Sequence, residues 1–300
     1  MDLGQDRRGV DMGPSAIRYA RLQAALEELG YPVTDLGNAA TPIPELMTKG
    51  EVATEARNKE GEVRHLGAVR DVCLRVAERA EDMVAEGFFP IFLGGDHSIS
   101  IGTVSGVARS FERTGVIWLD AHADFNTPQT SPSGNIHGMP LSVLTGRGHP
   151  ELVGIGGVGA SVRTEDVVIL GLRSVDVEER LMLREAGVRV YTMKEIDAYG
   201  VASIVRRAIR DLSHLDRIHL SFDLDVVDPD IAPGVGTPVR GGLTYREAHL
   251  VMELVNEAEI VTSLDIVEIN PILDYSNETA ELAVELAASL MGRSIIGIPG

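Results

Sequence analysis

The sequence contains a single cysteine and no long hydrophobic run. Cys73 cannot form an internal disulfide, and its setting in DVCLRVAERA is typical of the buried face of a helix. No apolar stretch approaches the roughly 18 residues of a membrane span, and the N-terminus MDLGQDRRGV lacks the basic start and apolar run of an export signal. These absences predict a soluble, cytoplasmic protein with no membrane partner.

Basic residues are also scarce. Lys and Arg total 27 against 45 Asp and Glu, which gives a formal net charge of -18 at pH 7. A charge of this sign repels phosphate backbones and anionic lipids, so no nucleic-acid partner is expected. The 300 residues are 44% hydrophobic and 24% charged, which is typical of a globular protein, and they contain no repeat or linker-like run. We therefore expect a single domain over residues 1–300.

Short apolar, β-branched runs alternate with helix-length amphipathic segments. This alternation predicts an α/β fold with three α-β-α layers around a central parallel sheet. Seven strands are expected, at 32–36, 89–94, 116–120, 167–172, 188–192, 218–225 and 260–269. Helices are expected at 14–29, 63–86, 99–112, 201–212, 244–257 and 278–291, and Thr244 with Glu247 predicts a capping box.

Two long irregular stretches, 37–59 and 126–150, interrupt the pattern. Connections of this length are uncommon unless they serve as binding loops or lids. The second begins where a predicted strand ends, and open α/β sheets bind ligands at the carboxyl ends of their strands. We therefore expect it to line a binding site.

Side chains that can bind metal follow two of the predicted strands. Asp120, His122 and Asp124 are spaced by two after the apolar run VIWL, and in an extended chain this spacing places all three on one side. Asp223 and Asp225 repeat the spacing at the end of the 218–225 strand. The carboxyl ends of parallel strands meet at one edge, so both groups are expected to converge.

A third strand end adds His97, which follows Gly94 and Gly95 in a sequence that permits a tight turn. Four carboxylates in one crevice would repel each other and raise each other's pKa unless cations neutralised them. Two histidines and four aspartates are enough ligands for two metal ions. The set suits a hard divalent ion better than zinc, and Mn²⁺ accepts both imidazole and carboxylate, so we expect two Mn²⁺ as cofactors.

Paired ions of this kind predict metal-assisted hydrolysis. Two metals roughly 3.5–4 Å apart share a water and convert it to hydroxide near neutral pH, so no Ser or Cys nucleophile is required. Gly234-Val-Gly236 is not followed by the Gly-Lys of a P-loop, which argues against nucleotide hydrolysis. His219 shares a face with Asp223 but lies deeper in the strand, so a hydrogen-bonded core histidine is expected there.

Three segments, GGDHS (94–98), DAHADFNTPQTSPSGNIHG (120–138) and SFDLDVVDP (221–229), resemble the signatures of the ureohydrolases and, within them, of the arginases. GVDMGPSAIR, GVGTPVRGGLTYRE and VEINP are similar to arginases too, so the resemblance covers nearly the whole chain. Arginases usually carry a short apolar strand before MDLG, within the sheet. This chain begins at Met1 inside that element, so the first strand of the family's sheet is expected to be missing here.

The resemblance implies a role for each metal-binding side chain. One Mn²⁺ would be held by His97, Asp120, Asp124 and Asp225 or its neighbour, and the other by His122, Asp120, Asp223 and Asp225, with the bridging carboxylates left open. It also implies that His137 is a proton shuttle, which suits a side chain with an unperturbed pKa of about 6.5. Asp124 would steady the nucleophile and pass its proton to the leaving amine, and Glu268 would face the substrate guanidinium.

The resemblance also implies a substrate. Asn126, Ser133 and Asn135 match positions that hold an α-carboxylate, Asp176 matches a position that contacts an α-amino group, and Thr237 matches one that lines the guanidinium pocket. The implied enzyme is an arginase of arginine metabolism, in which a metal-bridging hydroxide attacks L-arginine to give L-ornithine and urea. Homotrimers or homohexamers are implied as well.

Three alternatives stay open at this point. An agmatinase would need no carboxylate-binding loop. A metal-dependent amide deacetylase shares a related architecture but would need neither Glu268 nor the loop from Asn126 to Asn135. A metal-binding scaffold or regulator without activity is the third, and the presence of all six ligands together with His137 and Glu268 argues against it.

Overall fold

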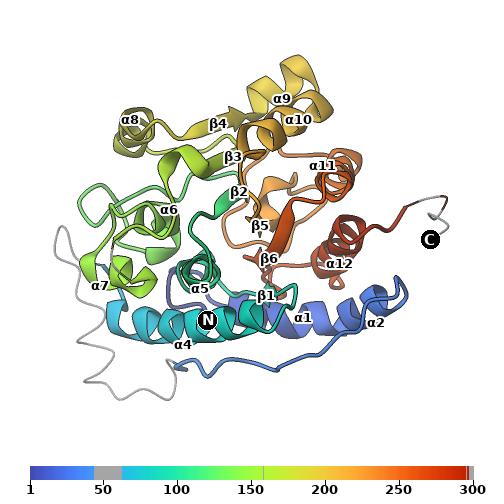
Figure 1. The fold of residues 1–300 in the computed structure, drawn as a ribbon, viewed down its shortest axis with the longest axis horizontal. Coiled ribbons are helices and arrows are strands. Elements are labelled where there is room, and N and C mark those ends of the chain that lie inside the picture. Colours follow the sequence, from blue (N-terminus) through green and yellow to red (C-terminus); the bar gives the residue numbers. More distant parts are fainter. Residues whose placement is uncertain (44–62, 158, 295, 297–300) are drawn as a thin grey trace.

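Within the described part of the chain, six parallel strands form one sheet (Figure 1). The computed structural model describes residues 1–43, 63–157, 159–294 and 296. Neighbouring strands follow the order β1-β6-β5-β2-β3-β4, and every pair is parallel. The strands are β1 (Ile91–Leu93), β2 (Gly115–Leu119), β3 (Val167–Leu172), β4 (Arg189–Thr192), β5 (Ile218–Asp223) and β6 (Val261–Val267).

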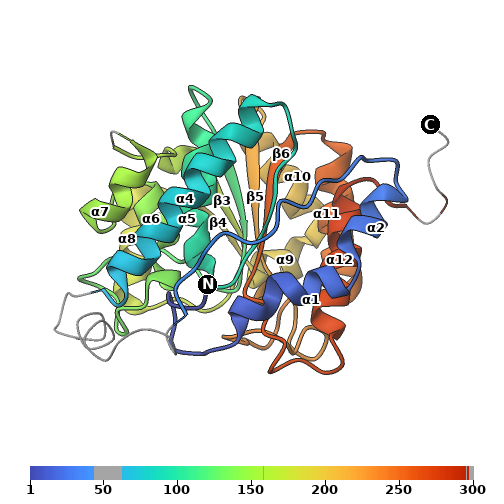
Figure 2. The ribbon, with the colours of Figure 1, turned by 90° about the horizontal axis from the view of Figure 1, so that it is seen from below.

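Helices cover both faces of the sheet (Figure 2), which confirms the predicted three-layer α/β fold. One layer contains α4 (Leu66–Ala85), α5 (Ser100–Arg109), α6 (Pro140–Leu144), α7 (Pro150–Val153) and α8 (Val177–Ala186). The other contains α1 (Gly13–Tyr19), α2 (Leu22–Glu27), α9 (Met193–Tyr199), α10 (Val201–Leu212), α11 (Tyr245–Glu257) and α12 (Glu278–Leu290).

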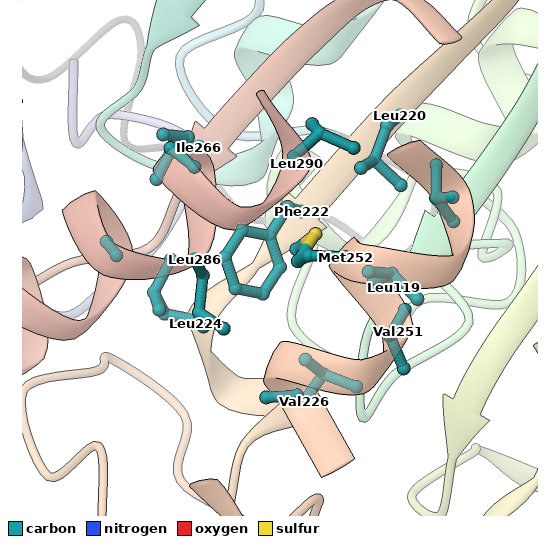
Figure 3. Close-up of a cluster of buried hydrophobic side chains, with 14 of the residues drawn as sticks. Leu119, Leu220, Phe222, Leu224, Val226, Val251, Met252, Ile266, Leu286 and Leu290 are labelled. Carbon is teal, nitrogen blue, oxygen red and sulfur yellow. The ribbon is translucent and has the colours of Figure 1, made fainter. Parts of the chain in front are cut away.

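The two faces of β5 differ in chemistry. Phe222 packs with Met252 of α11 and Leu286 of α12 in the larger hydrophobic core (Figure 3). Successive side chains of a strand point to opposite faces, so Ser221 points the other way, where its hydroxyl lies 3.3 Å from that of Ser100 in α5. One face of β5 therefore anchors the strand in the apolar core, while the other carries polar groups toward the carboxyl edge of the sheet.

The predicted strand at 32–36 is wrong. These residues lie outside the six-stranded sheet, and only Val33 is partly buried, against the larger core. A strand needs a neighbour that satisfies its backbone N–H and C=O groups, and no described strand pairs with this segment. The other six predicted strands are present, with ends that differ by up to two residues.

The predicted helices are present with shifted boundaries. The 14–29 segment is interrupted at Arg21, whose φ of 68° is incompatible with a continuous helix, and so it forms α1 and α2. The capping box at α11 is confirmed, because Thr244 N–H donates to Glu247 Oε2 at 2.9 Å and Glu247 N–H donates to Thr244 Oγ1 at 3.3 Å. Helices α8 and α9 were not predicted, although each begins with a capping box of its own.

The expected loop at 126–150 is partly helical, since it contains a 3₁₀ turn at Ile136–Gly138 and helix α6. Of the stretch 37–59, residues 37–43 are irregular and the remainder lies outside the described residues. Cys73 is buried in α4 as expected. None of the helices described here is long and apolar enough to cross a membrane.

Candidate active site

Four strands deliver side chains to one edge of the sheet. His97 follows β1, Asp120 follows β2, Asp223 ends β5 and Glu268 follows β6. These strands are adjacent and parallel in the order β1-β6-β5-β2, so their carboxyl ends lie side by side. Residues that are distant in sequence therefore meet at this edge.

The imidazole of His97 faces three carboxylates. Its Nδ1 atom lies 3.2 Å from an oxygen of Asp120, 3.0 Å from one of Asp124 and 3.2 Å from one of Asp223. All four side chains are buried. Among the described residues, Nδ1 has no hydrogen-bond partner of acceptable geometry. A buried nitrogen surrounded by carboxylate oxygens is the arrangement that a bound cation would satisfy, so these residues fit a metal ion.

A second group surrounds His122. Its Nδ1 lies 2.9 Å from Asp225 Oδ2 and 3.5 Å from Asp120 Oδ1. Asp120 thus turns one oxygen toward each histidine. The donor atoms of His97, Asp120 and Asp223 all lie within 4.8 Å of one another, and so do those of Asp120, His122 and Asp225. The geometry can hold two ions that share Asp120.

The directions of these carboxylates are set by turns, and not by an extended chain as the spacing in the sequence suggested. Strand β5 ends at Asp223, whose Oδ1 accepts the N–H of Asp225 at 2.8 Å, and a 3₁₀ turn follows at Leu224–Val226. Asp225 consequently faces His122, whereas Asp223 faces His97. Asp124 has a left-handed backbone with φ of 49°. Such strain persists only where the surroundings impose it, which is common at functional sites.

Neighbouring groups orient His97. Its Nε2 lies 2.8 Å from Ser221 Oγ, which leaves Nδ1 as the lone-pair nitrogen when Nε2 carries the proton. The ring of Trp118 stacks on the imidazole with centroids 4.1 Å apart and an interplanar angle of 6°. The indole Nε1 of Trp118 also donates to Asp120 Oδ2 at 3.0 Å.

A buried aspartate, Asp265, lies behind the groups that orient His97. Asp265 Oδ2 accepts hydrogen bonds from Ser100 at 2.6 Å and from Thr103 at 2.9 Å, both in α5. His219 Nε2 lies 3.1 Å from the same oxygen, and its Nδ1 lies 2.8 Å from Ser263 Oγ. His219 is therefore a hydrogen-bonded core histidine, as predicted.

His137 forms a second pair with the buried Glu268. His137 Nδ1 lies 3.1 Å from Glu268 Oε1, and the N–H of His97 donates to the same oxygen at 2.9 Å. The other oxygen of Glu268 accepts from Gln5 Nε2 at 2.7 Å. Glu268 has no exposed surface and does not line either cavity described below, so it lies behind His137 and Gln5.

Two adjoining cavities, of about 380 Å³ and about 150 Å³, open beside these groups. Both are lined by His122, Asn135, His137 and Thr237. Asn126, Ser133 and Asp176 line the smaller cavity. The structure thus brings together five of the six residues that the resemblance placed around the substrate: Asn126, Ser133, Asn135, Asp176 and Thr237. The sixth, Glu268, is buried and lines neither cavity.

Contacts among these residues shape the cavity wall. Asn126 Nδ2 donates to Asp176 Oδ2 at 3.0 Å, and Asn135 N–H donates to Ser133 Oγ at 3.2 Å. Thr237 Oγ1 donates to Asp225 Oδ2 at 3.3 Å. The amide of Asn126 and the carboxylate of Asp176 therefore form one polar unit, while Thr237 contacts the candidate metal cluster.

Crowding raises the pKa values of three groups in the cluster. Burial opposes the charge of His122, yet Asp225 and Asp120 raise its pKa to about 12. Burial and the charge of Asp120 raise the pKa of Asp124 to about 6. Burial and the charges of Asp225 and Asp120 raise the pKa of Asp223 well above its usual value. Protons bound to these side chains therefore balance the negative charge of the cluster, which bound metal ions would otherwise balance.

The sequence analysis missed Glu179 and Arg173, among other residues that shape the site. Glu179 accepts the N–H of Phe125 at 2.8 Å and that of Asp176 at 3.1 Å, and burial raises its pKa to about 7. The spacing from Asp176 to Glu179 is that of a capping box and could have revealed it. Arg173 donates to the carbonyls of Asp225 at 2.5 Å and Val239 at 2.7 Å, which ties the two flanks of the Thr237 loop, and its sequence context carries no such signal.

Comparison with known proteins agrees with this geometry. A family model described as the Arginase family matches residues 1–292. The chain belongs to the arginase family. The arginase of Bacillus caldovelox is 50% identical over 297 residues, which are 99% of this chain and 97% of that protein. The prediction of an arginase-family hydrolase is therefore confirmed.

Solved arginase structures share the fold. The native structure of the Bacillus caldovelox arginase has a TM-score of 0.92 at 50% identity, covering 98% of this chain and 96% of that chain. An Entamoeba histolytica arginase, solved in complex with L-ornithine, has a TM-score of 0.85 at 29% identity with the same coverage. The arginase-family fold thus extends over nearly the whole length of each protein.

We predict that Ser221→Ala lowers the affinity for Mn²⁺ by about 10- to 100-fold, because His97 loses the hydroxyl that orients its ring. Isothermal titration calorimetry of the metal-free protein measures the affinity for Mn²⁺. Ser289→Ala is the matched control, since it removes a hydroxyl 2.9 Å from Nδ1 of a histidine outside the metal groups, His249. Equal Mn²⁺ affinity in the parent and Ser221→Ala would contradict the assigned role of Ser221.

We also predict that Mn²⁺ binding releases protons and strengthens as pH rises. The pKa of His122, about 12, lies above the neutral range, so an ion must displace its proton at pH 7. Affinity should rise by about tenfold per pH unit for each displaced proton. Titrations at several pH values, in buffers of different ionisation enthalpy, count the protons. A pH-independent affinity would contradict the prediction.

Proposed function

We propose that this enzyme hydrolyses the guanidinium group of L-arginine to L-ornithine and urea, using two Mn²⁺ ions. One observation carries the proposal. The two adjoining cavities are lined both by residues of the histidine and aspartate cluster and by residues of the polar loop from Asn126 to Asn135. Relatives named arginase, one of them bound to L-ornithine, support the same substrate.

The donor atoms suggest how the ions are held. His97, Asp124 and Asp223 would hold one ion, His122 and Asp225 the other, and Asp120 would contact both. A set dominated by carboxylate oxygen with two imidazoles suits Mn²⁺. Bound in this way, the ions would lower the pKa of a water molecule toward neutrality and supply hydroxide as the nucleophile.

Asp124 and His137 are placed to move protons. Asp124 lines the smaller cavity, where its carboxylate could accept a proton from the nucleophile and return it to the leaving amine. His137 lines both cavities, so it can exchange protons between the reaction and water. Although burial opposes its charge, Glu268 raises the pKa of His137, which favours the protonated form needed for an acid.

The smaller cavity suits the amino-acid end of the substrate. Asp176 offers a carboxylate to an α-amino group. Asn126, Ser133 and Asn135 are neutral and can pair with an α-carboxylate without adding charge to an anionic site. One N–H of the Asn126 amide is used by Asp176, and the second is left for the substrate. A single polar unit would therefore bind both ends of the amino-acid group.

His137→Asn is expected to lower kcat by about 10²- to 10⁴-fold while Mn²⁺ content stays at the parent level, because His137 lies outside both candidate metal groups. His122→Asn should instead lose Mn²⁺. Steady-state kinetics and metal analysis of the purified variants measure both effects. If His137→Asn lost as much manganese as His122→Asn, the two roles would be assigned wrongly.

The protein should release urea from L-arginine with added Mn²⁺, lose this activity on chelation, and prefer L-arginine to agmatine. Agmatine lacks the α-carboxylate, so the polar groups that would bind this carboxylate lose their partner. Each group left without a partner costs about 1–3 kcal/mol of binding free energy. Ser133→Ala should therefore reduce kcat/KM for arginine more than for agmatine. Agmatine equal to or better than arginine on the parent enzyme would overturn the substrate assignment.

A further inference from the structure

Gln5 lies between Glu268 and the larger cavity. It is 6% exposed, and its Nε2 donates to Glu268 Oε2 at 2.7 Å. Its other polar atom, Oε1, is buried and has no hydrogen-bond partner among the described residues. A buried acceptor without a donor is rare in folded proteins and calls for an explanation, such as a ligand that is yet to bind.

Chemistry determines which way the amide of Gln5 points. An ionised carboxylate only accepts hydrogen bonds, so the nitrogen of the amide must face Glu268. The oxygen must then face away from it. The unpartnered atom is consequently an acceptor, and only a donor group can satisfy it.

Gly236 shows where this oxygen lies. A Cβ atom on Gly236 would be 2.8 Å from Gln5 Oε1 and 3.2 Å from Glu268 Oε2. Gln5 and Gly236 both line the larger cavity, together with His122 and His137. The absence of a side chain at Gly236 therefore leaves open the space beside the acceptor, next to the candidate metal cluster.

Glu268 is fully buried beside residues that line the larger cavity. Its Oε1 accepts the N–H of His97 and lies beside His137, and its Oε2 is occupied by Gln5. Hydrogen bonds in series polarise one another, so donation to a buried carboxylate makes the amide oxygen of Gln5 a better acceptor. Gln5 thus presents part of the charge of Glu268 at the cavity wall.

The preceding residue holds this arrangement in place. The N–H of Gly4 donates to Asp96 Oδ2 at 2.9 Å, and its carbonyl accepts the N–H of His137 at 3.0 Å. A Cβ on Gly4 would lie 2.5 Å from Asp96 Oδ1, so the backbone approaches too closely for a side chain. The segment that carries Gln5 is therefore tied both to the turn after β1 and to the His137 turn.

We propose that Gln5 is a substrate-binding residue, whose Oε1 accepts an N–H of the substrate guanidinium while its Nε2 holds Glu268. A guanidinium is a cation with only donors, so it matches an unpartnered acceptor backed by a buried carboxylate. The inference rests on the proposed hydrolysis of L-arginine and adds a residue to the guanidinium pocket.

The test compares Gln5→Met with the matched control Gln23→Met. Both replace a glutamine that donates to a glutamate, but Gln23 is exposed on α2, where it pairs with Glu27. Gln5→Met should lower kcat/KM for L-arginine by about 5- to 150-fold, mainly through KM, and Gln23→Met should leave it unchanged. Gln5→Asn, which withdraws the amide by one methylene, should show a similar loss and serves if the methionine variant does not fold.

Two further measurements separate substrate contact from a structural role. The affinity for L-ornithine, which lacks the guanidinium carbon and its terminal nitrogens, should stay within about twofold of the parent value, and Mn²⁺ content should not change. Unchanged kinetics in both Gln5 variants would overturn the inference, as would a parallel loss of ornithine or Mn²⁺ binding. A parent enzyme that releases no urea from arginine would instead overturn the proposed function.

Discussion

Repulsion among buried carboxylates is the constraint on which this site depends. Asp120, Asp124, Asp223 and Asp225 are all buried and share a space with two histidines. Anions this close cannot all be charged without cations between them, whether those cations are imidazolium protons or metal ions. The requirement explains why the pKa values of His122, Asp124 and Asp223 are all raised. It also explains why these side chains form candidate metal-binding groups.

The surrounding structure holds the ligands against that repulsion. His97 lies between the ring of Trp118 and the hydroxyl of Ser221, so its imidazole has little freedom to turn away from the carboxylates. Behind it, Asp265 joins β6 to the first turns of α5 through two hydroxyl donors. The left-handed backbone at Asp124 is held in place from α6, because the carbonyl of Asp124 accepts the N–H of Leu141 at 3.0 Å.

The sequence predicted the strand ends and the grouping of their carboxylate and imidazole side chains well, because both follow from local pattern. The prediction of side-chain directions failed where the chain turns. Asp223 and Asp225 were expected on one side, but the strand stops at Asp223 and the turn that follows sends Asp225 to the other histidine. The strand at 32–36 could not be distinguished from an irregular segment, since a short apolar run does not show whether a neighbouring strand exists.

Contacts between distant residues were harder still to predict. Gln5 and Glu268 are 263 positions apart, and nothing in either local sequence indicates that they meet. Similarly, the full burial of Glu268 behind His137 and Gln5 emerges only from packing. Local periodicity reports which face of an element is buried. It does not report which other element covers that face.

The position of β6 bears on when the site can assemble during synthesis. This strand, almost the last element of the chain, inserts between β1 and β5 and carries Glu268 at its end. Until it emerges from the ribosome, β1 lacks its one partner among the described strands, and both Gln5 and His137 lack the carboxylate that they share. Long-range pairing of this kind slows folding because distant segments must first meet. The catalytic edge is thus completed among the last parts of the fold, after most of the helices and strands have been made.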